Sequence, residues 1–382
     1  MATSIGGHGA KTVGTIQRLQ REVPRYFRRK RSLKSIRAVF VAEQTMKFEQ
    51  FEVPDAPAKS EVVVKTERTV VSAGTELANY TGLDEKVRVP GAWCCYPWNP
   101  GYGGVGRVVA AGPDAARRFK AGDRVYGFFH HAAHELVKTD TALLMSVPDG
   151  LDPTRAVMAR MASIAITSYR RARVALGDTV AIVGLGLVGN LAGQYFARAG
   201  QTVVGIDLVA DRCRLAERVG FAHTLDPSGK TPDDLAREIT RLTGSRPSLV
   251  VDAVGNSAIV ELCVQLVAEN GQVSMLGSPR GPHVKNMTGF LFDIHERGIE
   301  LVGALEWTYP TLKRSSPGVS VEANTELIFR MIESGALIVD PLRSHVLAPS
   351  RLDSAYQGLL NRKNEYMGVV IDWENNPPPA VS

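Results

Sequence analysis

The segment that most constrains the fold of this chain lies at residues 179–207. A short apolar run, TVAIV, is followed by GLGLVG at residues 184–189 and then by a stretch with helical periodicity. The glycine pattern fits G-x-G-x-x-G, the loop between a buried strand and a helix that wraps a dinucleotide pyrophosphate. A second strand-like run, TVVGID, ends in Asp207, 18 residues after Gly189. Strand, loop, helix and terminal acid together predict a dinucleotide-binding βαβ unit.

Each part of this loop has an expected task. Gly184 allows a tight turn, Gly186 lets the backbone approach the phosphates, and Gly189 lets the helix pack against the strand. The helix then begins at Leu187 and Val188, where free N–H groups face the phosphates. Asp207 would accept hydrogen bonds from the adenosine ribose and repel a 2′-phosphate, which favours NAD(H) over NADP(H).

A second match to the same pattern, GYGGVG at residues 101–106, lacks this context. It runs directly into the strand-like segment RVVAAG, and neither a helix nor a closing acid follows at the required distance. We therefore do not expect this loop to bind a nucleotide.

The rest of the chain shows two patterns of predicted secondary structure. Short β-favouring runs separated by Gly, Pro, Asp and Lys predict an antiparallel barrel or sandwich from residue 37 to about residue 150. After Pro153, strands and helices alternate, which predicts βαβ units on a parallel sheet. The last part adds two helices and the apolar strand YMGVVIDW. The sequence thus predicts an α/β fold with a separate β-rich domain.

Composition is that of an ordinary globular protein. Of 382 residues, 44% are hydrophobic and 22% are charged, and no apolar run approaches the ~18 residues of a membrane span. The four cysteines form no C-x-x-C pair, which fits a reducing compartment and offers no zinc cage. We expect a cytoplasmic protein without a membrane span.

The net charge of +6 is concentrated at the N-terminus. Residues 1–37 carry ten Lys or Arg and one acid, so the remaining chain is slightly acidic. This basic extension, residues 1–36, has three interpretations: a transit peptide, an arm that touches nucleic acid or anionic lipid, or a tail that packs on the body. The third is the simplest, and a nucleic-acid partner is not expected.

From Arg37 to Trp373, the strand-rich front, the dinucleotide-binding middle and the return segment resemble the medium-chain dehydrogenase/reductase superfamily. The resemblance implies a GroES-like β-rich catalytic domain at residues 37–164 and a Rossmann domain with a doubly wound parallel sheet at residues 165–306. Residues 307–382 would return to complete the catalytic domain. A homodimer is expected as well.

The zinc ligands of that superfamily are missing from this sequence. Zinc-dependent members use a Cys-Gly-Thr-Asp-like turn, a Gly-His-Glu turn and a later Cys. The corresponding places here hold Ala73, then Tyr102 and Gly103, and a Cys-free segment near Ser163. Losing all three leaves no tetrahedral N/S site, so no metal is expected. The residues resemble the zinc-independent branch, which includes the dehydrogenase of the bacteriochlorophyllide hydroxyethyl group and enzymes of sugar-polymer and secondary-metabolite pathways.

The resemblance also extends the expected cofactor site. It implies that Arg212 covers the adenosine ribose and that Gly255 and Gly277 lie at strand ends facing the cofactor. Thr167 is included as the residue four positions after the third former ligand place.

Without a metal, the substrate proton must move through side chains. Tyr102 stands at a former ligand position and is either the proton-transfer group or a packing aromatic. Thr75 can relay a proton, and Glu76 is either a base or an acceptor that holds Thr75 or Tyr102. His130 and His131 can titrate near neutral pH, so one of them is an alternative base unless both are ordinary loop residues.

Aromatic residues are expected to line the substrate site. Phe129 aligns with a pocket aromatic of the family, and Trp98 and Trp307 would add walls for a ring-shaped substrate. The resulting expectation is an NAD-dependent, zinc-independent oxidoreductase that interconverts a secondary alcohol and a ketone on a sugar, cyclitol or natural-product intermediate. The alternatives are an enoyl or quinone reductase of the same fold, which would prefer NADPH, and a nucleotide-binding protein without turnover.

Overall fold

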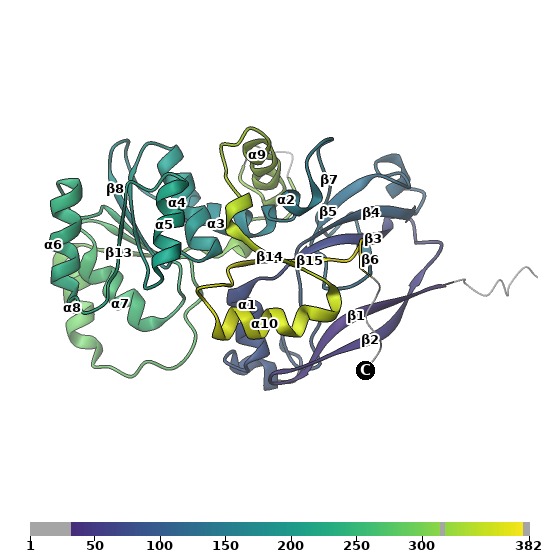
Figure 1. Ribbon diagram of the computed structural model, residues 1–382, viewed down its shortest axis with the longest axis horizontal. Helices are drawn as coiled ribbons and strands as arrows, with labels where there is room; N and C mark the ends of the chain where they lie inside the picture. The colour runs from purple at the N-terminus through teal and green to yellow at the C-terminus, as the bar shows by residue number, and fades with distance from the viewer. Residues whose placement is uncertain (1–31, 314–317, 377–382) are drawn as a thin grey trace, which may run out of the picture.

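The computed structural model describes residues 32–313 and 318–376, which form two lobes (Figure 1). One lobe contains a six-stranded parallel sheet, and the other contains a seven-stranded, mainly antiparallel sheet and a two-stranded ribbon. The fold class predicted from the sequence is confirmed. The basic extension lies outside the described residues, apart from residues 32–36, which begin the first strand.

The parallel sheet has the strand order β10-β9-β8-β11-β12-β13. Its strands are β8 (Thr179–Val183), β9 (Thr202–Ile206), β10 (His223–Leu225), β11 (Leu249–Asp252), β12 (Gln272–Met275) and β13 (Glu300–Gly303). Every residue of β8 and β11 is buried. Such continuous burial is the expected state of parallel strands covered on both faces by helices.

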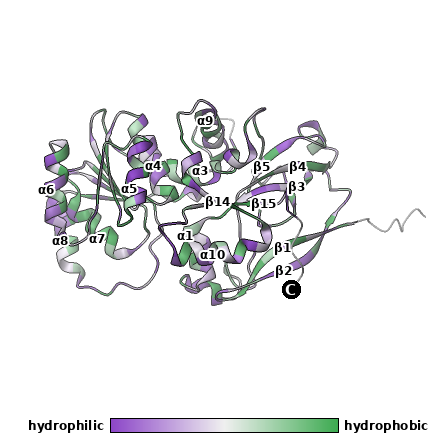
Figure 2. Cartoon of the chain, in the orientation of Figure 1, coloured by the Kyte–Doolittle hydropathy of each residue, from purple (hydrophilic) through white to green (hydrophobic). Residues whose placement is uncertain are grey.

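Helices cover both faces of this sheet. They are α3 (Ala159–Arg171), α4 (Leu187–Arg198), α5 (Ala210–Arg218), α6 (Pro232–Thr243), α7 (Ser257–Leu266) and α8 (Met287–Arg297). Because side chains alternate along a strand, Val180 and Ile182 join the core beneath α3 and α4, whereas Ala181 and Val183 join the core beneath α6 and α7. The outer helix α6 is largely hydrophilic in Figure 2 and starts with a capping box of Thr231 and Asp234.

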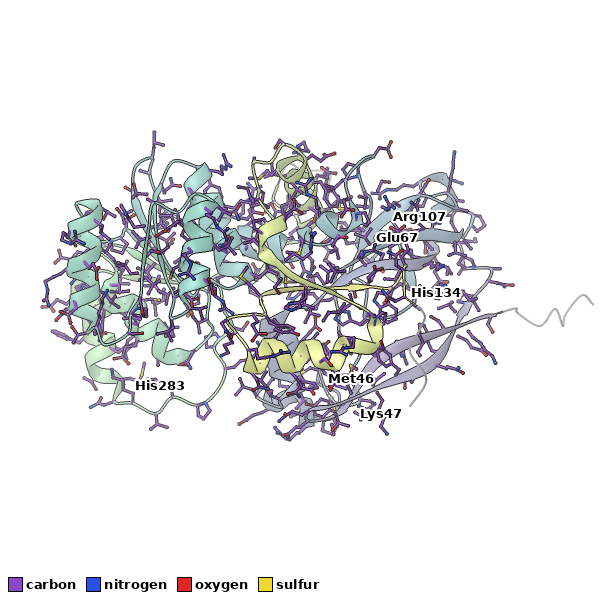
Figure 3. The ribbon with its side chains drawn as sticks, in the orientation of Figure 1. Met46, Lys47, Glu67, Arg107, His134 and His283 are labelled. Atoms are coloured by element: carbon purple, nitrogen blue, oxygen red, sulfur yellow. The ribbon has the colours of Figure 1, made fainter. Side chains whose placement is uncertain are left out.

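The β-rich lobe is built around a seven-stranded sheet in the order β14-β15-β3-β4-β5-β7, with β6 paired to β3. Its strands and those of the ribbon are β1 (Ser32–Ala42), β2 (Thr45–Pro54), β3 (Glu61–Val70), β4 (Gly104–Ala111), β5 (Arg124–Gly127), β6 (His134–Lys138), β7 (Leu144–Ser146), β14 (Arg343–Leu347) and β15 (Gly368–Asp372). Glu67 and Arg107, labelled in Figure 3, form an ion pair between β3 and β4, with Nε and Oε1 2.9 Å apart.

Short elements connect and cover the two lobes. They are the helices α1 (Ala73–Tyr80), α2 (Pro153–Ala156), α9 (Val321–Glu333) and α10 (Leu352–Asn361), and the 3₁₀ turns η1 (Glu85–Arg88), η2 (Ala115–Arg117), η3 (Glu306–Thr308), η4 (Asp340–Leu342) and η5 (Pro349–Arg351). The main hydrophobic core continues from β4 and β5 through α3 into β8 and α4, so the lobes share buried side chains. None of the described helices has the length and hydropathy needed to cross a bilayer.

Candidate functional site

The glycine loop at residues 184–189 leaves the carboxyl end of β8 and enters α4. Gly184 has a φ of 90°, which favours glycine, and a Cβ on Gly189 would lie 1.9 Å from the Gly184 carbonyl oxygen. Gly186 is the N-cap of α4, where no side chain caps the helix. The N–H groups of the first turn, at Leu187 and Val188, therefore remain available to phosphate oxygens.

Asp207 follows β9 and supports this loop. Its Oδ2 accepts a hydrogen bond from the Leu185 N–H (2.7 Å), and its Oδ1 accepts one from the Val209 N–H (2.8 Å). A carboxylate offers about four acceptor positions, so lone pairs remain for ribose hydroxyls at the 8% of this side chain that is exposed. Arg212 lies beside it, with Nη1 3.8 Å from Asp207 Oδ2, and also donates to the Lys363 carbonyl (2.8 Å).

Gly255 and Gly277 meet just beyond β11 and β12. A Cβ on Gly277 would lie 2.3 Å from the Gly255 nitrogen, so neither position tolerates a side chain. Asp252 holds this corner, because its Oδ1 accepts hydrogen bonds from the Val254 N–H (2.8 Å) and the Gly255 N–H (3.1 Å). Thr167, by contrast, is buried within α3 and donates to the Ser163 carbonyl at 3.4 Å.

The loop at residues 101–106 places Tyr102 against α1, on the β-rich side of the site. The Tyr102 hydroxyl hydrogen-bonds to Ser72 and lies close to the hydroxyl of Thr75, which is half-buried. Burial raises the pKa of Tyr102 above its ordinary value. The Arg160 guanidinium and the Ser72 and Thr75 hydroxyls act in the opposite direction without cancelling the rise, and the Glu76 carboxylate adds to it. Tyr102 is therefore a neutral phenol near pH 7.

Arg160 joins Tyr102 to the other lobe. Its guanidinium lies 4.8 Å from the ring centroid of Tyr102, 4.8 Å from that of Phe128 and 5.4 Å from that of Trp307. Two parallel hydrogen bonds of 2.8 and 2.5 Å run from this guanidinium to the Glu306 carboxylate, which follows β13. Burial alone would lower the pKa of Arg160, but Glu306 more than compensates and raises it.

Glu76 and His131 belong to a buried network behind this site. Glu76 Oε1 accepts from the Ser72 N–H (2.9 Å), and its Oε2 accepts from His131 Nε2 (3.0 Å) and from the Tyr356 hydroxyl (2.6 Å). Both Glu76 and His131 are fully buried. Glu76 therefore has the geometry of an acceptor, but it holds Ser72, His131 and Tyr356, whereas Thr75 or Tyr102 was the expected partner.

The same network defines the tautomer of His131. The Glu76 carboxylate can only accept, so in the neutral imidazole Nε2 donates to it and Nδ1 accepts from the Thr69 hydroxyl (2.6 Å), whose oxygen accepts in turn from the indole of Trp373 (3.0 Å). The ring proton is thereby assigned to Nε2, where it is donated to Glu76. Without exposed surface, His131 has no route to a substrate except through this network.

His130 faces outward instead. Its side chain is 45% exposed, and its Nδ1 lies 3.0 Å from Glu135 Oε1. Burial lowers the pKa of His130, but the hydrogen bond and the charge of Glu135 outweigh this effect and raise the pKa above its ordinary value. Its backbone adjoins Gly101, so His130 borders the loop that carries Tyr102.

The expected aromatic residues lie in three different places. Trp307 lies in the cluster around Arg160, with its ring edge-on to Phe128 at 5.3 Å. Trp98 packs against Phe40 at 5.6 Å, in the core of the ribbon. Phe129 is fully buried in the core of the seven-stranded sheet and does not line an open site, whereas the neighbouring Phe128 packs against Arg160.

Sequence reasoning missed Ser72, Phe128, Arg160 and Glu306. Ser72 and Phe128 directly adjoin expected residues, and this adjacency is the signal that could have found them. Arg160 and Glu306 are separated by 146 residues, and no local pattern joins them.

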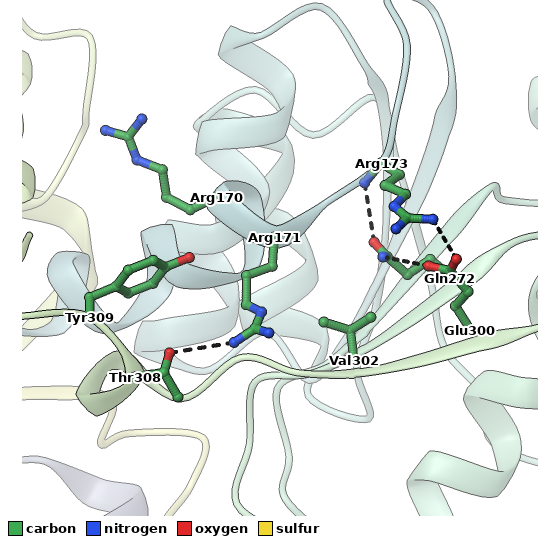
Figure 4. Close-up of a pocket in the computed structure, with 8 residues that line it drawn as sticks. All are labelled: Arg170, Arg171, Arg173, Gln272, Glu300, Val302, Thr308 and Tyr309. Atoms are coloured by element: carbon green, nitrogen blue, oxygen red, sulfur yellow. Dashed lines mark hydrogen bonds and ion pairs between the residues drawn. The ribbon is translucent and has the colours of Figure 1, made fainter. Parts of the chain in front are cut away.

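A separate cavity of about 670 Å³ lies at the opposite end of the parallel sheet (Figure 4). Gln272 and Glu300, the first residues of β12 and β13, form part of its wall. Three arginines of α3 and the loop after it line the cavity, and each is hydrogen-bonded to a neighbour: Arg170 to Asn324, Arg171 to Thr308 and Arg173 to Glu300. This cavity is separate from the glycine loop, which lies at the carboxyl ends of the strands.

Known proteins share this architecture. Residues 188–313 match the family described as zinc-binding dehydrogenase. The fold is similar to that of 2R,3R-butanediol dehydrogenase from Bacillus subtilis, with a TM-score of 0.72 and 19% identity over 88% of this chain and 99% of the other. The chain is thus similar to the zinc-binding dehydrogenase family over residues 188–313, and its fold is that of alcohol and polyol dehydrogenases.

Two curated proteins that resemble this chain differ in how much of it they match. D-guloside 3-dehydrogenase from Shigella flexneri is 31% identical over 44% of this chain, and the match spans about half (48%) of that relative. The 2-desacetyl-2-hydroxyethyl bacteriochlorophyllide A dehydrogenase from Cereibacter sphaeroides is 27% identical over 83% of this chain and 92% of its own length.

The residues at the former ligand places do not fit the zinc of zinc-type alcohol dehydrogenases. Ala73 has no donor atom, a Cβ on Gly103 would lie 2.4 Å from Arg160 Cγ, and the Ser163 hydroxyl donates to Glu306 Oε1 (2.5 Å). Among residues 32–313 and 318–376, no group of three or more His, Cys, Asp or Glu could hold a metal ion. A guanidinium beside these positions would also repel a divalent cation.

Proposed function

We propose that this chain is an NAD-dependent, zinc-independent oxidoreductase that interconverts a secondary alcohol and a ketone. The observation that carries the proposal is that two sets of residues follow the carboxyl ends of strands of the same parallel sheet. The glycine loop and Asp207 follow β8 and β9, and Glu306, which anchors Arg160 beside Tyr102, follows β13. Open α/β sheets bind their ligands at the carboxyl ends of their strands.

Within this proposal, the chain's own residues bind the cofactor and move the proton. The first turn of α4 holds the pyrophosphate, and Asp207 holds the adenosine ribose. When bound, the nicotinamide cofactor would supply the hydride acceptor or donor. The Tyr102 hydroxyl donates a proton to the substrate oxygen during ketone reduction and is reprotonated through Ser72 and Thr75; the reverse transfers accompany alcohol oxidation.

The proposed substrate is the secondary alcohol of a sugar, a cyclitol or a natural-product intermediate. Its support is the pair of relatives whose printed names specify a guloside and a hydroxyethyl bacteriochlorophyllide. Screening polyols, cyclitols and sugar derivatives for NAD⁺ reduction would identify it.

We also propose that the enzyme is a cytoplasmic homodimer. The free state of the four cysteines supports a reducing compartment. The strand β13 supports dimerisation, because it is one of the two edge strands of the parallel sheet.

Replacing Asp207 tests the cofactor preference. The Asp207→Ala variant should lose most of its affinity for NADH, because the ribose hydroxyls lose their acceptor, and it should retain its affinity for NADPH. Fluorescence titration measures both affinities. The matched control is Asp226→Ala, an exposed acid that follows the neighbouring strand β10. Equal loss of both cofactors would contradict the ribose assignment.

Metal analysis tests zinc independence. Protein purified without chelators should contain well under one zinc per chain, because the former ligand places offer no tetrahedral donor set. Inductively coupled plasma mass spectrometry provides the measurement, and dialysis against EDTA should leave turnover unchanged. Stoichiometric zinc would overturn this part of the proposal.

A further inference from the structure

The Arg160–Glu306 ion pair fills the space beside the former zinc-ligand positions. Gly103 leaves room for the aliphatic part of Arg160, since any side chain there would collide with it. Ser163 donates to the same Glu306 oxygen that accepts from Arg160 Nη1. Residues that bind a metal in zinc-type relatives are thus replaced by residues that accommodate and anchor an arginine.

This pair is costly to bury. Arg160 is 1% exposed and Glu306 is 2% exposed. Desolvating two charges consumes much of their mutual attraction, so such a pair is weak evidence for a role in stability alone. The bidentate geometry and the Ser163 hydroxyl instead fix the guanidinium in one place. That place is against the face of the Tyr102 ring.

We propose that Arg160 is a positioning residue for Tyr102. Its guanidinium, held by Glu306 (which Ser163 holds in turn), packs against the phenol ring and supplies the fixed positive charge that a metal ion supplies in zinc-type relatives. The inference rests on the proposed function, in which the Tyr102 hydroxyl transfers the substrate proton. Arg160 acts through Tyr102, because its guanidinium is buried beneath the aromatic rings.

Groups from three elements face Tyr102 and determine its ionisation. Arg160 of α3 favours the phenolate, as do hydrogen bonds from Ser72 and Thr75 at the start of α1. Glu76 of α1 opposes ionisation, and Glu306 of η3 partly neutralises Arg160. Removing Arg160 and Glu306 together should therefore make ionisation of the Tyr102 phenol less favourable.

The experiment is a ¹⁹F NMR titration of protein labelled with 3-fluorotyrosine, since ring fluorination acidifies the phenol. The Tyr102→Phe variant identifies the Tyr102 resonance. In the double variant Arg160→Met/Glu306→Gln, which leaves no buried charge unpaired, the titration midpoint of Tyr102 should rise by about one pH unit. In Arg160→Lys, which keeps the charge, the midpoint should stay nearer that of the wild type.

Two further variants keep the test decisive. If the double variant does not fold, Glu306→Asp shortens the anchor and should move the midpoint in the same direction. Arg170→Met, on the exposed end of the same helix, is the matched control and should leave it unchanged. An unchanged midpoint in a folded double or Glu306→Asp variant would overturn the proposal. Because the readout needs neither substrate nor cofactor, its failure is distinct from failure of the proposed reaction.

Discussion

Tyr102 shows how a single side chain acquires its properties from several elements. The ring lies in the loop after Pro100. The hydroxyls of Ser72 and Thr75 come from the start of α1, and Arg160 comes from α3. Because its pKa is raised, the phenol stays protonated at neutral pH and is ready to donate. In the proposed reaction, ketone reduction should therefore persist at mildly alkaline pH and decline only as the pH passes the pKa of Tyr102.

Removing the Tyr102 hydroxyl tests this role. Tyr102→Phe should lower turnover by ~10²-fold or more, the usual contribution of a positioned proton donor, while cofactor affinity stays unchanged. Steady-state kinetics in both directions measure the effect. Tyr309→Phe, which alters a tyrosine in the separate cavity of Figure 4, is the control. Unchanged turnover in Tyr102→Phe would transfer the proton role to another group, with His130 the first to test.

At the residue scale, the predictable part of the site was its local part. The glycine loop and Asp207 lie within 24 residues of one another, and their order along the chain is itself the signal. Phe129 shows the limit of that approach. Phe129 packs in the core of the seven-stranded sheet, whereas the adjacent Phe128 packs against Arg160. An alignment error of one position therefore assigns a buried core residue to the site. The Arg160–Glu306 pair could not be predicted from the sequence, because only folding brings the two residues together.

At the scale of elements, alternation of strands and helices predicted the parallel sheet, because each βαβ unit is local in sequence. The strand pairing of the seven-stranded sheet was harder to predict. Its strand β15, from the C-terminal part, pairs antiparallel with β3, and Val370 lies opposite Val70. Pairings across such sequence separations leave no periodic signal. The strand β1 also begins at Ser32, inside the segment assigned to the basic extension.

A prediction at the scale of elements concerns Asp252, the last residue of β11. Asp252 is fully buried, one of its oxygens has no hydrogen-bond partner among the described residues, and burial raises its pKa. Asp252→Asn should stabilise the cofactor-free protein by up to about 1 kcal/mol at pH 7, because the neutral amide avoids the desolvation cost. Urea denaturation measures the difference.

The pH dependence of that difference has a definite sign. A raised carboxyl pKa means that the folded state binds the proton more tightly, so the penalty is present above the folded-state pKa and absent below the unfolded-state value near 4. The advantage of Asp252→Asn should therefore disappear on acidification. An advantage that persists below pH 4 would assign the effect to packing instead of charge.

At the scale of the whole molecule, the edge of the parallel sheet bears on assembly. Among the described strands, β13 pairs on one side only, with β12. Leu301 is 38% exposed within it, and Leu305, just beyond it, is 53% exposed. Unpaired backbone groups beside exposed apolar side chains are what a second copy would cover in a two-fold symmetric dimer.

Charging this edge should separate the dimer. The double variant Leu301→Lys/Leu305→Lys should sediment as a monomer under conditions where the wild-type chain sediments as a dimer, because burying two ammonium groups opposes pairing. Analytical ultracentrifugation measures both masses. Leu176→Lys is the matched control, because Leu176 is 84% exposed and precedes β8, away from the β13 edge. A wild-type chain that sediments as a monomer, or a double variant that remains dimeric, would place the contact elsewhere or remove it.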